Sequence, residues 1–194
     1  MKASIRGLPG AWVLLLAALA AHDPAQAAPV CRQDDALPTA NGVLRRLRCT
    51  DAEFPTIDRW ELDGQLLLQG PYPIGRETRD DSKRLYVLSS ASSPRTHCTE
   101  NLFLLDLSTT QPRVFRFGVR HACNDYHWAS WGKQRSVIAI KNNVRFVYAN
   151  GRLTPPRHDV ALMEKLQFSA YGGSNVFEEI VPFAEEITPA APDK

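Results

Sequence analysis

Hydrophobic and polar positions alternate most clearly near the middle of the chain. Val144, Phe146 and Tyr148 recur at every second position with polar or smaller residues between them. This two-residue period places them on one apolar face of a strand and turns Arg145 toward the other, wetter face. The segment Val137 to Lys141, which is apolar as far as Ile140, precedes this strand, and Asn142-Asn143 lies between the two. Asparagine tolerates the positive φ of a two-residue hairpin turn, so the pattern predicts a β-hairpin here.

Two further hairpins follow from the same reasoning. Leu102 to Leu107 is a short apolar run, and Val114 to Phe117 follows it after the turn-forming segment Ser108 to Pro112. This arrangement predicts two antiparallel strands. Arg59 to Gln69 is interpreted as a strand, a turn at Asp63-Gly64 and a second strand.

The C-terminal part has weaker patterns. Val160, Met163 and Leu166 fall at three-residue intervals, which predicts at most one short helix near residues 159–168. Pro182 interrupts the segment Val176 to Ile187 and restricts a strand there to a sheet edge or a bulge.

These elements predict a mainly β protein in which antiparallel hairpins form a β-sandwich or a small barrel. A small propeller-like array of blades is the alternative. Asp63, Asp106 and Asn150 each follow an apolar segment, at a spacing of about 43 residues. A repeat of roughly 40 to 45 residues with several strands per unit is typical of propeller blades.

Two segments, Asp80 to Val87 and Asn101 to Thr109, resemble the blades of WD40-like propellers of the TolB type. That family has a Pro-Asp-Gly turn before an inner strand and an Asp-Leu-x-Thr ending to the next. The chain departs from it because Asp80 and Ser82 stand at the proline and glycine positions, and because Trp131 replaces the aspartate of a later turn. The resemblance covers about residues 79–153. At about 40 residues per blade, the length of the mature chain allows four blades at most.

The N-terminus has the features of a secretory signal peptide. Lys2 and Arg6 precede an apolar run, and Ala25-Gln26-Ala27 provides the small residues of a cleavage site. We therefore expect a signal peptide over residues 1–27, one β-rich domain over 28–187 and a disordered tail over 188–194. No later segment approaches the roughly 20 apolar residues of a membrane helix. We expect a periplasmic or secreted protein without membrane insertion.

The four cysteines that remain after cleavage are consistent with export, because an oxidising compartment favours disulfides. Three pairings are possible. We favour Cys31 with Cys49 and Cys98 with Cys123, since each pair closes a modest loop. Zinc binding by these thiols is the competing interpretation, but the chain has no Cys-x-x-Cys pair.

The formal net charge of the whole chain is only +2. Nucleic-acid binding usually requires a strongly basic domain, so no nucleic-acid partner is expected. Arg45, Arg46 and Arg48 form a local basic cluster, which we interpret as a solvated face.

Metal chemistry has one candidate. His121, Cys123, Asp125 and His127 alternate, so an extended strand would place them on one face. A metal-dependent hydrolase using His121, Asp125 and His127 is therefore the alternative function. Ordinary histidines beside a disulfide are the simpler interpretation, and no metal or cofactor is expected.

Other catalytic patterns are missing from the sequence. Gly172 to Val176 lacks the second glycine of a Gly-x-Ser-x-Gly elbow, and the pairs Glu178-Glu179 and Glu185-Glu186 are interpreted as solvated acids. No catalytic residue is assigned, and we do not expect an enzyme. The chain is instead expected to act through protein contact, as an inhibitor or immunity-type protein that neutralises an envelope-targeting enzyme. The expected partner-binding residues are Tyr126, His127, Trp128 and Trp131, because aromatic side chains dominate binding hot spots.

Overall fold

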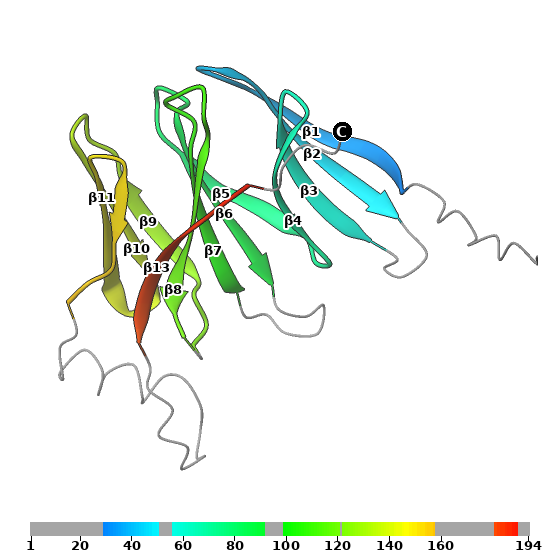
Figure 1. Ribbon diagram of the computed structural model, residues 1–194. Coiled ribbons are helices and arrows are strands. Elements are labelled where there is room, and N and C mark those ends of the chain that lie inside the picture. The colour runs from blue at the N-terminus through cyan, green and yellow to red at the C-terminus, as the bar shows by residue number, and fades with distance from the viewer. Residues whose placement is uncertain (1–28, 51–55, 92–98, 121, 158–180, 190–194) are drawn as a thin grey trace, which may run out of the picture.

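The computed structural model describes residues 29–50, 56–91, 99–120, 122–157 and 181–189. Its strands form three antiparallel sheets (Figure 1). The first sheet has the order β1-β2-β3-β4, the middle sheet β13-β8-β7-β6-β5, and the third sheet β12-β11-β10-β9.

The strands run consecutively within each sheet, apart from β13, which is added to the middle sheet from the C-terminal region. The first sheet comprises β1 (Val30–Thr39), β2 (Gly42–Thr50), β3 (Ile57–Leu62) and β4 (Gln65–Gly70). The middle sheet comprises β5 (Ile74–Arg79), β6 (Leu85–Ala91), β7 (Thr99–Asp106), β8 (Arg113–Val119) and β13 (Pro182–Ile187). The third comprises β9 (Tyr126–Ser130), β10 (Arg135–Ile140), β11 (Val144–Ala149) and β12 (Arg152–Thr154), with a short 3-10 turn, η1 (Lys141–Asn143), between β10 and β11.

The sheets pack face to face in a row, with the middle sheet between the other two (Figure 1). Leu88 and Leu105 of the middle sheet belong to the same hydrophobic cluster as Trp60 of the first sheet. Leu104 and Phe117 of the middle sheet share a second cluster with residues of the third sheet, including Phe146. Burial on both faces explains why residues 102–105 form a continuous apolar run instead of an alternating one.

The predicted hairpins are confirmed. β10 pairs with β11, and Val144, Phe146 and Tyr148 are all buried on one face. Asn142 and Asn143 have φ values of 62° and 60°, the positive φ that the sequence predicted. The connection is one residue longer than the predicted turn, because Ile140 pairs with Val144. β3 and β4, and likewise β7 and β8, pair as predicted.

β13 is an edge strand and begins at Pro182, as the proline predicted. Two arginines of β8, together with Arg120 directly after it, bind the acidic side chains of β13. Arg113 binds Glu186 at 2.6 Å, and Glu185 accepts from Arg116 at 3.0 Å and from Arg120 at 2.9 Å. Glu185 and Glu186 are partly exposed, at 38% and 48%, and they also form ion pairs with the sheet, whereas Glu178 and Glu179 lie outside the described residues. The predicted helix near residues 159–168 lies outside the described residues.

The prediction of a mainly β fold of antiparallel hairpins is confirmed. The described sheets stack as in a sandwich, and they do not close into a barrel. Asp63 and Asn150 lie in the turns after β3 and β11, and Asp106 is the last residue of β7. The spacing of about 43 residues therefore arises because each of these residues marks the end of the third strand of its sheet in chain order. The resemblance to TolB-type propellers stays a prediction.

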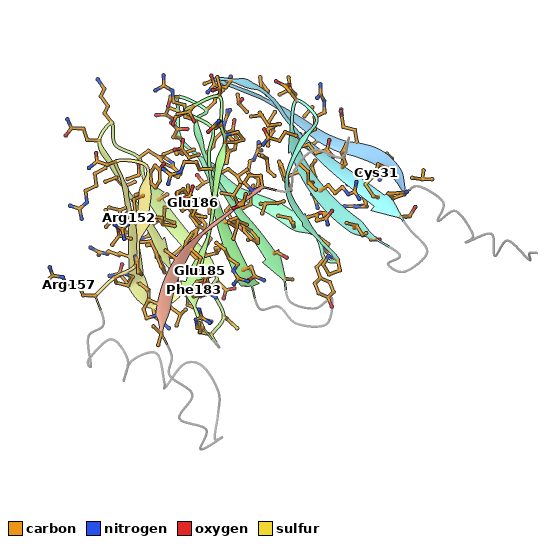
Figure 2. The ribbon with its side chains drawn as sticks, in the orientation of Figure 1. Cys31, Arg152, Arg157, Phe183, Glu185 and Glu186 are labelled. Atoms are coloured by element: carbon orange, nitrogen blue, oxygen red, sulfur yellow. A yellow bond between two sulfur atoms is a disulfide. The ribbon has the colours of Figure 1, made fainter. Side chains whose placement is uncertain are left out.

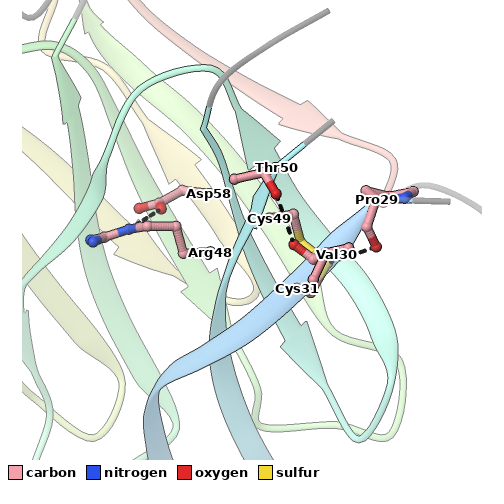
Figure 3. The surroundings of a disulfide bond; sticks show 7 residues. All are labelled: Pro29, Val30, Cys31, Arg48, Cys49, Thr50 and Asp58. Atoms are coloured by element: carbon pink, nitrogen blue, oxygen red, sulfur yellow. Dashed lines mark hydrogen bonds and ion pairs between the residues drawn. A yellow bond between two sulfur atoms is a disulfide. The ribbon is translucent and has the colours of Figure 1, made fainter. Parts of the chain in front are cut away.

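The first disulfide is confirmed as well. Cys31 and Cys49 face each other on β1 and β2, and their sulfur atoms are bonded (Figure 3). Cys123 is also disulfide-bonded, but its predicted partner Cys98 lies outside the described residues. The second pairing therefore stays a prediction.

The arginines of β2 correct one interpretation, because two of them do not form a solvated face. Arg46 is only 20% exposed, and its Nε donates to the fully buried carboxylate of Asp58 at 2.9 Å. Arg48 approaches the same carboxylate at 3.6 Å (Figure 3). The interpretation as a solvated face failed because the partner carboxylate of Asp58 lies on the next strand, β3. Whether Asp58 faces these arginines depends on the register of β2 with β3, which the sequence does not show.

Candidate binding surface

The candidate partner-binding residues lie on or just after β9, an edge strand of the third sheet. Trp128 pairs with Ala139 of β10, and Tyr126 pairs with Ile140, so that His127 is an extra residue in the ladder. Such a bulge reverses the alternation of side chains along the strand. Tyr126 and Trp128 therefore point to opposite faces of the sheet, although they are only two positions apart in the sequence.

The bulge divides the four predicted residues into two groups. Tyr126 and Trp131 pack against the hydrophobic cluster between the middle and third sheets. Burial raises the pKa of the Tyr126 hydroxyl, which also interacts with Thr78 of β5. Trp128 lies on the outer face, half-buried, and His127 is exposed. The structure thus leaves His127 and Trp128 available on the surface, while Tyr126 and Trp131 mainly support the packing of the sheets.

The outer face of the third sheet is built from cross-strand rows that the register defines. One row contains Trp128, Ala139 and Arg145, and the far row contains Arg135, Ala149 and Arg152. Val137 and Val147 form the centre of the row between them, and both are half-buried. This face is opposite to the one that packs on the middle sheet. It lies at the end of the row of sheets, where Arg152 and Arg157 are found, far from Cys31 (Figure 2).

Arg145 and Trp128 form an ordered pair on this face. The guanidinium carbon of Arg145 lies 5.6 Å from the centre of the Trp128 ring, and its Nε donates to Asn143 Oδ1 at 3.0 Å. Ala139, the shared cross-strand neighbour of both, is fully buried. The ring quadrupole attracts the cation, and the hydrogen bond fixes the direction of the guanidinium.

Positive charge is concentrated on the third sheet. Between residues 126 and 157 the sequence has no aspartate or glutamate, whereas it has six cationic residues: Lys133, Arg135, Lys141, Arg145, Arg152 and Arg157. Lys141 pairs with Asp125 at 3.6 Å. Within the described part of the chain, Arg135, Arg145 and Arg152 form no ion pair, and all three are exposed.

Several arginines of the other two sheets are ion-paired. Arg46 and Arg48 are paired with Asp58, and Arg48 also approaches Asp34 at 2.9 Å. The β8 arginines are paired with the glutamates of β13. Among the described residues, the outer face of the third sheet therefore carries exposed arginines without a carboxylate partner, which the small net charge of the whole chain does not reveal.

The geometry expected for a metal site is not formed by the residues that the structure describes. β9 begins at Tyr126, so Cys123 and Asp125 precede the strand and do not share a strand face with His127. Asp125 binds Lys141 and accepts from the Thr99 backbone N–H at 3.3 Å. His121 lies outside the described residues. The described part of the chain has no cluster of three potential metal ligands.

A shallow groove of about 340 Å³ lies where β4 of the first sheet meets β7, β8 and β13 of the middle sheet. Leucines 66 to 68, Phe103 and Ile187 make its lining mainly apolar. Its polar side chains are Gln69, Asn101 and Arg116, and Arg116 already binds Glu185. This set of side chains contains no nucleophile with an adjacent base.

Comparison of the chain with protein families, curated proteins and solved structures finds no match. Among the described residues, no helix is long and apolar enough to cross a membrane. The assignment of function therefore rests on the chemistry of the surface.

Proposed function

We propose that this chain is an exported protein that acts by binding another protein through the outer face of its third sheet. Its role is that of an inhibitor or immunity-type protein that neutralises an enzyme directed at the cell envelope. The observation that carries the proposal is a set of exposed arginines that have no carboxylate partner among the described residues and are arranged around Trp128 and the two central valines.

The composition of this face matches the chemistry of protein recognition. Tryptophan and arginine are enriched among the residues that contribute most to binding, and the centre of an interface is usually less charged than its rim. Val137 and Val147 form such a centre, and Arg135, Arg145 and Arg152 surround it. A sheet face is also rigid, so little conformational entropy is lost when a partner binds.

Export is supported by the Cys31–Cys49 disulfide and by the signal-peptide pattern of residues 1–27. Disulfides persist in oxidising compartments and are rare in the cytosol of most cells. The face of the third sheet would then be presented to proteins of the periplasm or the external medium.

The test uses the mature protein, immobilised and exposed to envelope extract. The captured protein is identified by mass and is then purified for titration against variants. Trp128→Ala should weaken binding at least about tenfold, as expected for a hot-spot aromatic side chain. Tyr72→Ala, which changes a half-buried aromatic residue between β4 and β5, is the matched control and should bind like the wild type. Equal affinities of the Trp128→Ala variant and the wild type would contradict the proposal.

A further inference from the structure

We infer that the outer face of the third sheet recognises an acidic protein surface, with carboxylates placed to meet Arg135, Arg145 and Arg152. This inference rests on the proposed function and adds the chemistry of the partner. Each of the three side chains is exposed, and none has a carboxylate partner among the described residues.

The register fixes how far apart these charges are. Arg135 and Arg152 flank Ala149 from the two neighbouring strands, so their backbones are about 9 to 10 Å apart. Arg145 is four residues from Ala149 along β11, a distance of roughly 13 Å. A partner with several carboxylates spread over a surface of this size can meet all three arginines. One small anion cannot span them.

The floor between the arginines is small and apolar. Ala149 leaves space between Arg135 and Arg152, and Val137 and Val147 lie beside it in the next row. Planar guanidinium groups bind carboxylates through two parallel hydrogen bonds, which fixes orientation as well as strength. A partner surface with an apolar centre surrounded by carboxylates would therefore pair with the arginines at the rim of this face and pack on the valines at its middle.

A protein surface fits these features better than a polyanion or a membrane. A phosphate backbone offers a continuous row of charges and would leave Val137 and Val147 without an apolar partner. A lipid surface is entered by protruding apolar side chains, whereas Trp128 is half-buried and stacked with Arg145. The arrangement of charge at the rim and aliphatic side chains at the centre matches the anatomy of protein interfaces.

The experiment titrates the mature protein with three defined probes and follows tryptophan fluorescence and calorimetric heat. The probes are a copolymer of glutamate and tyrosine, a single-stranded DNA oligonucleotide, and phosphatidylglycerol vesicles. The copolymer should bind most tightly, and its affinity should fall as salt screens the charges. A variant with Arg135→Gln, Arg145→Gln and Arg152→Gln should lose at least about tenfold in affinity.

The matched control removes three positive charges elsewhere, by Arg32→Gln, Arg45→Gln and Arg76→Gln on β1, β2 and β5. It should bind the copolymer within about twofold of the wild type if the location of the charge decides binding. The single variant Arg152→Gln, at an exposed edge position, replaces the triple variant if that protein does not fold.

Tighter binding of DNA or vesicles would overturn the inference, and so would equal losses in the two triple variants. If the copolymer does not bind but Trp128→Ala still weakens the complex with the captured protein, the acidic partner is excluded and the proposed function stands. If Trp128→Ala also has no effect on that complex, both fail.

Discussion

Replacement of Asp58 by alanine should be among the most destabilising single changes in the first sheet. The Asp58 carboxylate is fully buried, and it accepts from Arg46 on β2 and from the Ile74 backbone N–H at 2.8 Å. Trp60 of the same strand donates to the Ile74 carbonyl at 3.0 Å. Since Ile74 begins β5, these contacts attach the first sheet to the middle sheet.

The magnitude follows from what the substitution leaves behind. Removal of one partner from a buried ion pair costs about 3 to 5 kcal/mol. Arg46 retains 20% exposure and can recover some hydration, so the lower part of that range applies. The unpaired N–H of Ile74 adds about 1 kcal/mol or more. A total near 4 kcal/mol corresponds to a decrease in melting temperature of roughly 8 to 16 °C.

Urea denaturation of the mature protein, followed by circular dichroism, measures this difference. Asp34→Ala is the matched control, because Asp34 also pairs with two arginines but its partners Arg32 and Arg48 are 77% and 39% exposed. The control should lose no more than about 1 kcal/mol. If Asp58→Ala loses less than about 1 kcal/mol as well, the contact between Asp58 and Ile74 does not hold the sheets together as described.

Three other predictions concern stability. Trp131→Ala should cost about 2 to 4 kcal/mol of unfolding free energy, because the side chain packs on the core, whereas Trp128→Ala on the outer face should cost about 1 kcal/mol. Similar losses for the two variants in urea denaturation would contradict the placement of Trp128 on the outer face. Tyr148→Phe should cost about 1 to 3 kcal/mol, because buried Asp106 loses the hydroxyl that donates to it. Burial raises the pKa of Tyr148 above its unfolded value of about 10. The stabilisation from this neutral hydroxyl should therefore be fully present below about pH 10 and be lost as the pH rises toward the folded pKa. The phenylalanine variant should lose less stability over the same pH range. Replacement of both Cys31 and Cys49 by serine should cost about 3 kcal/mol, since the bond closes a loop between residues 18 positions apart, and a melting temperature unchanged from the wild type would show that the bond contributes nothing.

Local signals predicted the hairpins correctly because the turns determine them. Asn142-Asn143 and Asp63-Gly64 adopt the positive φ values that these residue types permit. The hairpin of β1 and β2 was not predicted, since β1 is mostly exposed and lacks an alternating apolar pattern. Its pairing depends on the whole register from Val30 to Thr50 and on the Cys31–Cys49 disulfide.

The candidate site was predicted only in part, for a similar reason. The aromatic residues near β9 were identified, but a two-residue period places Tyr126 and Trp128 on the same face. The bulge at His127 depends on pairing with β10 and reverses this arrangement. The basic character of residues 126–157 was present in the sequence, but the net charge of +2 concealed it. The ion pairs that neutralise several arginines of the other sheets depend on the fold and could not be predicted from the sequence.

The most direct test of the binding face places a negative charge at its centre. Val147→Glu changes a half-buried outer residue of β11, and Leu47→Glu makes the same change on the outer face of the first sheet. Both variants should remain folded, because neither residue belongs to a hydrophobic core cluster. The affinity for the protein captured from envelope extract should fall at least about tenfold for Val147→Glu and remain unchanged for Leu47→Glu. An unchanged affinity for Val147→Glu, or a loss only for Leu47→Glu, would contradict the assignment of the third sheet as the binding surface.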